Sequence, residues 1–232
     1  MGAIYGIGVG PGDPALLTLR AAEVLQRVSA VMAPRATREG GSLALSIARP
    51  HLPASCAVLE AVFPMTEERA VLEQAWQDAA AALLARARQG EAVAFLTLGD
   101  ALLYSTWSYL LRAIRRQDAE IEVVTIPGIT AMSACAAAVN RPLAEGRAPL
   151  LVWPDAPPTD LAPLLEIAPN LVFMKAARHL RRLADMAEAR GAAAVAVQRC
   201  TLPEQRVIGD LRDDPGRPDY FTTVLLQAEG GR

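Results

Sequence analysis

AIYGIGVGPGDP, residues 3–14, is the stretch of this chain that decides the fold class. Its first part is short, apolar and ends in glycines, which predicts a buried strand over residues 3–9. Apolar side chains then recur at helical spacing over residues 15–28, so a helix follows the glycine turn. A strand that leads through glycines into a helix is typical of open α/β sheets, whose ligands bind at such strand ends.

The rest of the chain continues the alternation of strands and helices. Further strands are predicted over residues 29–33, 57–62, 92–97, 121–126, 149–153, 170–174, 193–198 and 222–227, with helices over 42–49, 67–88, 105–116, 132–139 and 176–190. The proline-rich stretch 154–163 is predicted to be a loop or a short helix. Such alternation indicates βαβ units and largely parallel sheets. The polar residues 115–118 are the expected joint between two α/β domains, 1–117 and 118–232.

Composition limits the classes of protein to which the chain can belong. Of the 232 residues, 52% are hydrophobic and 21% charged, which indicates a buried core, and a net charge of -2 argues against a nucleic-acid binder. Three cysteines and two histidines are too few for a disulfide framework, and no dedicated metal site is expected. Because no apolar run reaches the length of a membrane-spanning helix and no signal pattern precedes the first strand, we expect a cytoplasmic protein without a membrane contact.

Three strand ends in the first half of the chain carry glycine. They are Gly8-Val9-Gly10-Pro11-Gly12-Asp13-Pro14, Leu98-Gly99-Asp100 and Pro127-Gly128-Ile129-Thr130-Ala131. Each could be a plain connection, and Asp100 could simply cap the helix that follows it. Glycine also lets the backbone approach a ligand closely. Taken together, the three turns predict one ligand-binding edge.

The first turn does not fit the common nucleotide motifs. Its spacing differs from the dinucleotide fingerprint, and Pro11 removes an amide that a pyrophosphate would bind. The second predicted strand ends at Ala33-Pro34-Arg35, without an acidic residue to hold a ribose. No Gly-Lys-Ser/Thr follows the turn, so a phosphate-binding P-loop is also disfavoured. A dehydrogenase is therefore a weak alternative.

In order and spacing, the three turns resemble those of the tetrapyrrole methylases, over nearly the whole chain. The segments 41–44, 63–65, 104–106, 174–175 and 220–221 are most similar to the branch that methylates the C-20 meso carbon of precorrin-2 during cobalamin biosynthesis. Two departures stand out. Ala101 replaces the usual proline after Gly-Asp, and Pro34 stands where the uroporphyrinogen-methylating branch has a proposed catalytic aspartate, which disfavours that branch.

The resemblance implies two αβα domains with parallel or mixed sheets, an active-site trough between them, a homodimer, and S-adenosylmethionine as the methyl donor, released as S-adenosylhomocysteine. Carried over by position, the cofactor contacts are Pro11, Leu98, Gly99, Asp100, Leu103, Thr130, Ala131, Met174 and Cys200. Tyr104 is the nearest polar side chain to this edge and the candidate catalytic residue.

The tetrapyrrole substrate implied by the resemblance carries eight carboxylates. Arginine and lysine bind carboxylates well, so Arg35, Arg38 and Lys175 are expected substrate contacts, beside the turn residues Gly10 and Gly12. Each cation could instead belong to ordinary solvated surface. The sequence is also compatible with methylation of a different ring carbon, with a cobalt-containing form of the substrate, and with a catalytically silent nucleotide-binding α/β protein.

Overall fold

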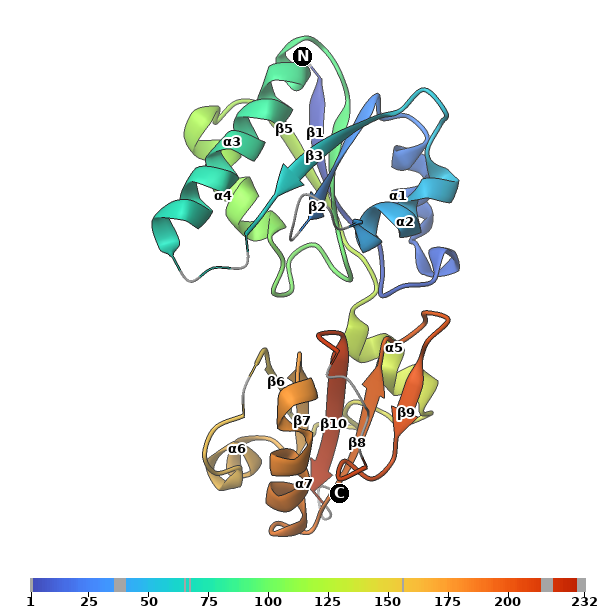
Figure 1. Cartoon of the computed structure of the whole chain (residues 1–232), viewed down its shortest axis with the longest axis vertical. Helices are drawn as coiled ribbons and strands as arrows, with labels where there is room; N and C mark the ends of the chain where they lie inside the picture. Colours follow the sequence, from blue (N-terminus) through green and yellow to red (C-terminus); the bar gives the residue numbers. More distant parts are fainter. Residues whose placement is uncertain are drawn as a thin grey trace. The chain divides into compact units, whose positions relative to one another are not determined.

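The computed structural model describes residues 2–35, 41–64, 66, 68–155, 157–213 and 219–228. Contacts within the chain divide it into two compact units, Met1–Thr130 and Ala131–Arg232. Each unit has its own five-stranded sheet (Figure 1). Each also has its own hydrophobic core.

The sheet of the first unit is entirely parallel. Its strands are β1 (Ala3–Gly8), β2 (Ala30–Arg35), β3 (Ala57–Val62), β4 (Val93–Thr97) and β5 (Glu122–Ile126), in the order β3-β2-β4-β1-β5. Strand β1 is paired on both sides, with Ile4 opposite Val93 of β4 and Val123 of β5. Because β5 belongs to this sheet, the first unit extends past the domain joint expected at 115–118 and ends at Thr130.

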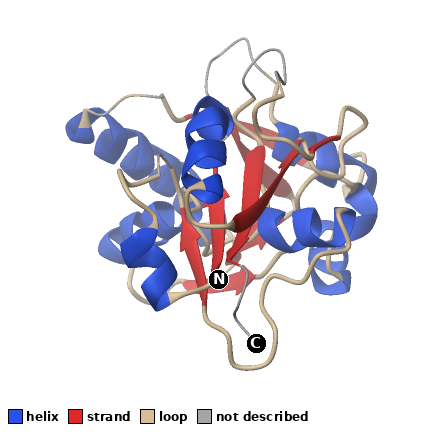
Figure 2. Ribbon diagram, turned by 90° about the horizontal axis from the view of Figure 1, so that it is seen from below, coloured by secondary structure: helices blue, strands red, loops and turns tan. Residues whose placement is uncertain are grey.

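Helices cover both faces of this sheet (Figures 1 and 2). They are α1 (Leu19–Leu25) and α2 (Leu43–Ala48) on one face, α3 (Arg69–Arg88) and α4 (Trp107–Gln117) on the other, and the 3₁₀ turns η1 (Pro14–Leu16) and η2 (Arg49–His51). The helix expected from residue 15 begins at Leu19, because Asp13 caps η1 and Thr18 separately caps α1. None of the helices in the described ranges is long and apolar enough to cross a membrane.

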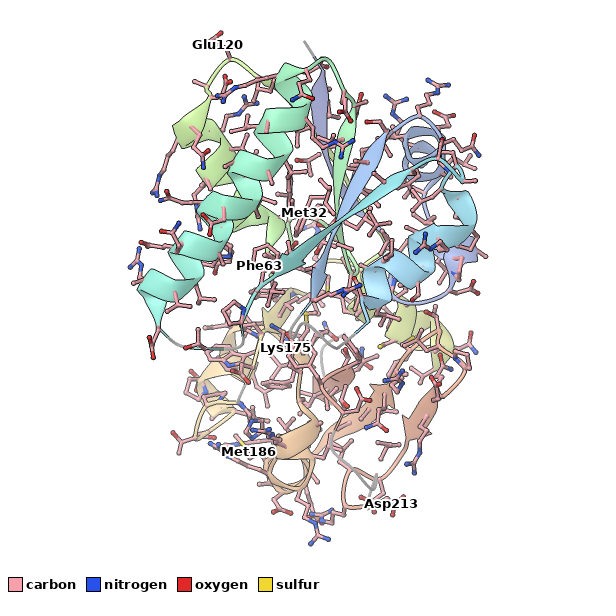
Figure 3. All side chains as sticks on the ribbon, turned by 45° about the horizontal axis from the view of Figure 1, so that its top comes forward. Met32, Phe63, Glu120, Lys175, Met186 and Asp213 are labelled. Atoms are coloured by element: carbon pink, nitrogen blue, oxygen red, sulfur yellow. The ribbon has the colours of Figure 1, made fainter. Side chains whose placement is uncertain are left out.

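The core between the first sheet and α3 and α4 is dense and aromatic. Met32 and Phe63, labelled in Figure 3, pack there with the buried ring of Phe95, and the Phe63 and Phe95 ring centroids lie 6.0 Å apart. The indole of Trp107 is fully buried and stacks on Phe95 at 6.0 Å. This packing fixes the start of α4 against the centre of the sheet.

The sheet of the second unit is mixed. Its strands are β6 (Leu150–Trp153), β7 (Asn170–Met174), β8 (Ala192–Gln198), β9 (Arg206–Ile208) and β10 (Thr222–Ala228), in the order β6-β7-β10-β8-β9. Only β6 and β7 are parallel, since β10 runs antiparallel to both of its neighbours. The expected fold class, α/β with parallel and mixed sheets, is confirmed. The three-residue strand β9 was not predicted, because so short an edge strand has too few residues to show alternation.

Helices also cover the second sheet on both faces. Residues of α6 (Ala162–Ile167) and α7 (Leu180–Glu188) pack on one face, and those of α5 (Ala131–Ala138) on the other. Helix α6 begins at Ala162, at the end of the proline-rich stretch 154–163, and continues beyond that stretch to Ile167. The expected helix over 176–190 is divided into the 3₁₀ turn η3 (Ala177–His179) and α7.

A glycine in the middle of β1 makes room for the buried indole. A Cβ atom built on Gly6 would lie far inside the van der Waals radius of the Trp107 ring. Trp107 also donates from its indole nitrogen to the Thr125 hydroxyl at 2.9 Å, so the ring has little freedom to move away. Gly6 is therefore required by packing, although glycine ordinarily weakens the interior of a strand.

We predict that Gly6→Ala lowers the free energy of unfolding by about 3 kcal/mol, the upper range for overpacking a core. Gly41→Ala, where an added Cβ meets nothing within 4 Å, is the matched control and changes stability by less than about 0.5 kcal/mol. Urea denaturation followed by tryptophan fluorescence measures both. Combining Gly6→Ala with Trp107→Leu recovers part of the loss, because the smaller side chain removes the clash. If Gly6→Ala and Gly41→Ala were equally stable, the packing role of Gly6 would be contradicted.

Candidate active site

The carboxyl ends of β1 and β4 form the topological switch point of the first sheet. The chain leaves β1 toward α1 on one face, whereas it leaves β4 toward α4 on the other. The two strands are neighbours, so their outgoing loops diverge to opposite faces. Ligands of open α/β sheets bind in the crevice that such a divergence creates.

The two loops at the switch point are joined by their backbones. Gly10 and Gly99 form an isolated antiparallel bridge, in which the Gly10 amide donates to the Gly99 carbonyl at 3.2 Å and the Gly99 amide donates back at 2.7 Å. Both residues have left-handed backbone conformations, with φ of +80° and +70°. Such angles cost a residue with a side chain about 1–2 kcal/mol, so glycine is favoured at both positions.

A third strand end meets the same point. A Cβ atom on Gly8 would lie 2.6 Å from the Gly99 carbonyl oxygen and 2.7 Å from the Gly128 amide. A Cβ atom on Gly128 would collide with the Gly99 and Gly8 carbonyls. The ends of β1, β4 and β5 therefore approach one another backbone to backbone, and no side chain fits between them.

The carboxylate of Asp100 holds these loops together. One oxygen, Oδ1, accepts from the amides of Leu102 at 2.8 Å and Leu103 at 3.2 Å, while Oδ2 accepts from the Gly128 amide at 3.0 Å. Hydrogen bonds from backbone amides to an ionised carboxylate are stronger than neutral ones. Asp100 does not cap the following helix, because α4 begins only at Trp107. Its carboxylate instead binds amides of the turn before that helix and of the loop after β5, and the second contact was not revealed by the sequence.

Tyr104 lies on the turn that Asp100 organises. Its backbone is left-handed, with φ of +50°, and 48% of the residue is exposed. Leu102 on the same turn is also exposed, whereas Leu103 between them is partly buried. A bulky residue in this conformation persists only where the surroundings enforce it, and such strain clusters at functional sites.

A second group of predicted residues gathers at one end of the second sheet. Met174 ends β7 and pairs with Thr223 of β10, while Cys200 follows β8, whose last residue pairs with Thr222. Lys175 comes next to Met174 with a left-handed φ of +58°, and its ammonium group lies 5.2 Å from the centre of the Tyr220 ring. A cation over an aromatic face at this distance contributes about 0.5–1 kcal/mol.

Cys200 is held by a second thiol. The side chain of Cys135, on α5, hydrogen-bonds to Cys200, and this contact and burial together raise the pKa of the Cys135 thiol well above its usual value. The same hydrogen bond lowers the pKa of Cys200. Because Arg199 and Thr201 on either side of Cys200 are both left-handed, the loop has a defined, strained shape. The bond also links this loop to the helix that begins at Ala131.

The structure groups most of the predicted site residues within each unit. In the first unit, Pro11 and Gly12 continue the loop after Gly10, Leu98 precedes the Gly99 bridge, and Thr130 follows the Gly128 contact. Arg35 ends β2 at the carboxyl edge of the same parallel sheet. Ala131, Met174, Lys175 and Cys200 belong to the second unit. Arg38 lies outside the described residues.

Sequence reasoning missed the residues that shape the site from behind. Gly8 and Gly128 were quoted within motifs, but their mutual contact depends on strand order, which the motifs do not contain. The contact between Cys135 and Cys200 was also missed, because 65 positions separate the two residues along the chain. For Gly8 and Gly128, the sequence offered one signal, which is that each glycine lies at or just after the end of a strand.

Glycine-bearing strand ends that meet at the switch point of a parallel sheet are typical of α/β proteins that bind a small ligand at this edge. Residues 3–213 match the family described as Tetrapyrrole (Corrin/Porphyrin) Methylases, and the chain belongs to this family. The enzyme class predicted from the three glycine turns, an S-adenosylmethionine-dependent C-methyltransferase acting on a tetrapyrrole, is thereby confirmed.

Individual relatives agree with this assignment along the full length. The chain is 37% identical to a cobalt-precorrin-2 C(20)-methyltransferase of Salmonella typhimurium, covering 98% of this chain and 97% of the relative. It is 31% identical to a precorrin-2 C(20)-methyltransferase of a Sinorhizobium species, covering 97% and 95%.

Solved structures show the same fold. A cobalt precorrin-4 methyltransferase superposes with a TM-score of 0.75 at 18% identity, over 97% of this chain and 94% of that one. A uroporphyrin-III C-methyltransferase of Thermus thermophilus, solved with S-adenosylhomocysteine, has a TM-score of 0.67 at 20% identity, over 97% of both chains.

We predict that Asp100→Asn lowers the free energy of unfolding by about 1–3 kcal/mol, because the new amide nitrogen turns a donor toward a backbone donor. Asp100→Ala costs more, since all three amides lose their acceptor. Asp78→Asn is the matched control: its carboxylate accepts from Gln74 on the exposed side of α3, and this substitution changes stability by less than about 0.5 kcal/mol. Urea denaturation compares the three variants, and an Asp100→Asn protein as stable as Asp78→Asn would refute the role of the carboxylate.

Proposed function

We propose that this enzyme transfers a methyl group from S-adenosylmethionine to the C-20 meso carbon of precorrin-2 during cobalamin biosynthesis. The proposal rests mainly on the packing of three strand ends at the switch point, through Gly8, Gly10, Gly99 and Gly128. The Asp100 carboxylate connects two of these loops by a hydrogen bond. The relatives that methylate C-20, with which the chain is aligned along its length, support the choice of ring carbon.

The residues at the switch point fit a cofactor that needs close backbone approach. Where three strand ends carry no side chain, a ligand can lie directly against amides and carbonyls. The exposed turn of residues 102–104 borders the same loops, which adds apolar and aromatic surface beside the backbone. On this proposal Pro11, Leu98, Gly99, Leu103 and Thr130 contact the cofactor from the first unit.

The second unit adds its own set of contacts. We assign cofactor contacts to Ala131, Met174 and Cys200. Met174 and the loop of Cys200 lie at the same end of their sheet, and the bond between Cys135 and Cys200 holds that loop to α5. The strained backbone at Arg199 and Thr201 supports a binding role, because such conformations are kept where a function requires them.

The division of labour follows from the chemistry of the donor. Bound S-adenosylmethionine supplies a methyl group that is already electrophilic, so the protein need not supply a nucleophile. The protein has to orient donor and acceptor, and positioning of this kind contributes about 7–11 kcal/mol to lowering a barrier. The carboxylate of Asp100 accepts hydrogen bonds from three backbone amides, so this residue positions the loops of the site. Tyr104 is the exposed polar side chain on the turn and our candidate for the catalytic residue.

The substrate contacts follow from its charge. We assign the binding of its eight carboxylates to Arg35, Arg38 and Lys175, with Gly10 and Gly12 lining the approach. Arg35 ends β2 on the carboxyl edge of the first sheet, and Lys175 follows the last residue of β7. We expect the enzyme to work as a homodimer, as its resemblance to the family implies, and to be cytoplasmic.

A second candidate substrate is the cobalt complex of the same ring. The Salmonella relative, at 37% identity, is named for the cobalt form, whereas the Sinorhizobium relative, at 31%, is named for the metal-free form. Both reactions place the methyl group on the same carbon. The two candidates are distinguished by comparing kcat/KM for the two rings.

We predict that the wild-type protein binds S-adenosylhomocysteine with one site per chain in isothermal titration calorimetry. Asp100→Ala weakens this binding about ten-fold or more, equivalent to about 1.4 kcal/mol, because the loops it joins separate. Incubation with S-adenosylmethionine and either ring increases the mass of the ring by one CH2 unit, because the incoming methyl group replaces a hydrogen that leaves as a proton. A folded wild-type protein that binds no S-adenosylhomocysteine would remove the proposed function.

We predict that Arg35→Ala raises KM for the tetrapyrrole about ten-fold while leaving the affinity for S-adenosylhomocysteine unchanged, since a lost charge-assisted bond costs about 1.5–3 kcal/mol. Arg69→Ala, which removes an exposed arginine paired with Glu73 on α3, is the control and changes neither value. Steady-state kinetics and calorimetry provide the two measurements. An unchanged KM for the tetrapyrrole would show that Arg35 does not bind the substrate.

A further inference from the structure

A buried polar pair lies directly behind the turn that carries Tyr104. The hydroxyls of Thr97, the last residue of β4, and Ser105 are 2.8 Å apart, and each residue is only 6% exposed. Buried hydroxyls are rarely placed in an apolar core without a reason, because each must find a partner there. Neither residue has a role in the cofactor or substrate contacts assigned above.

The pair is part of a longer chain of hydrogen bonds. Ser105 Oγ also accepts from the backbone amide of Trp107 at 3.1 Å, and the Trp107 indole nitrogen donates to Thr125 Oγ1 at 2.9 Å. Thr97 belongs to β4 and Thr125 to β5, so the chain connects two strands through the start of α4. These strands flank β1, whose Gly6 lies against the indole.

This network anchors the far end of the turn. At the near end, Asp100 binds the amides of Leu102 and Leu103 and the loop after β5. At the far end, Ser105 follows Tyr104 directly and is tied back to β4. The exposed residues Leu102 and Tyr104 therefore lie on a short segment that is fixed at both ends. The left-handed conformation of Tyr104 lies immediately before the second anchor.

The indole prevents the anchor from moving. Trp107 is fully buried, stacks on Phe95 and fills the space that a side chain at Gly6 would occupy. A rigid ring with its nitrogen bonded to Thr125 has no alternative position in a close-packed core. The amide that Ser105 accepts from is thus fixed relative to the strand ends of the switch point.

We infer that Thr97 and Ser105 are positioning residues: their hydroxyl pair fixes the turn of residues 98–104 and the direction of Tyr104 relative to the bound cofactor. The inference rests on the proposed function, because it assigns the turn to cofactor binding. Neither hydroxyl touches the ligand. A site held by buried neighbours in this way binds its ligand without having to order the turn first.

The test uses pairs of variants that differ by one hydroxyl. Thr97→Val keeps the shape of the side chain and removes its hydroxyl, whereas Thr97→Ser keeps the hydroxyl and removes a methyl group. Ser105→Ala removes the other member of the pair. Ser46→Ala, which removes a hydroxyl bonded to the Leu43 carbonyl on α2, is the control for a helix of the same unit. All four are made in the full chain.

Calorimetry with S-adenosylhomocysteine and steady-state kinetics are measured where urea denaturation shows each variant fully folded. We expect Thr97→Val and Ser105→Ala each to weaken S-adenosylhomocysteine binding about ten-fold and to lower kcat, with KM for the tetrapyrrole unchanged. Thr97→Ser and Ser46→Ala bind within about two-fold of the wild type. The double variant Thr97→Val/Ser105→Ala binds no more weakly than Ser105→Ala alone, because Ser105→Ala already removes the bond between the two hydroxyls.

Two results would overturn the inference. The first is a folded Thr97→Val or Ser105→Ala protein that is less stable but binds S-adenosylhomocysteine as the wild type does, which would make the pair purely structural. The second is Thr97→Ser binding as weakly as Thr97→Val, which would assign the effect to packing. Failure of the proposed function is distinguished from both, since in that case the wild type itself would not bind S-adenosylhomocysteine.

Discussion

Close backbone packing among the ends of β1, β4 and β5 is the constraint on which the first unit depends. Three strands of a parallel sheet normally keep their side chains between neighbouring loops, but here Gly8, Gly99 and Gly128 bring carbonyls and amides to within contact. A side chain at Gly8 or Gly128 would push the loops apart, and the left-handed backbone of Gly99 favours glycine there. Because the switch point is made of backbone, the arrangement of its loops is set by the sheet and by the contacts among the strand ends.

The same constraint explains the use of polar groups around the crevice. Loops that approach this closely present several amides at once, and these amides need hydrogen-bond acceptors. Asp100 satisfies three of them with one carboxylate, and the hydroxyl of Ser105 satisfies another at the start of α4. The methyl donor brings the reactive group itself. Asp100 and Ser105 therefore shape the backbone around the switch point.

In the second unit, the loops after β7 and β8 also have unusual backbone conformations, but at residues other than glycine. Instead of glycine, Lys175, Arg199 and Thr201 take left-handed conformations at the ends of β7 and β8. Arg199 bonds to Asp219 at 3.1 Å, and its amide donates to the Phe221 carbonyl at 2.8 Å, so hydrogen bonds hold this loop in its shape. This backbone strain cannot be predicted from the sequence, because lysine, arginine and threonine occur in many backbone conformations.

The sequence by itself determined the α/β class, the alternation of strands and helices, the three glycine turns and, through their resemblance, the family. Hydrophobic periodicity and glycine placement are local properties, so they can be read without knowing which strands are neighbours. Strand order is not local. Only the tertiary structure decided that β5 joins the first sheet, that Asp100 reaches Gly128, and that Thr97, Ser105 and Trp107 form one network. These contacts depend on which strands are neighbours in the sheet and on how the loops between them pack. Local sequence patterns contain no information on either.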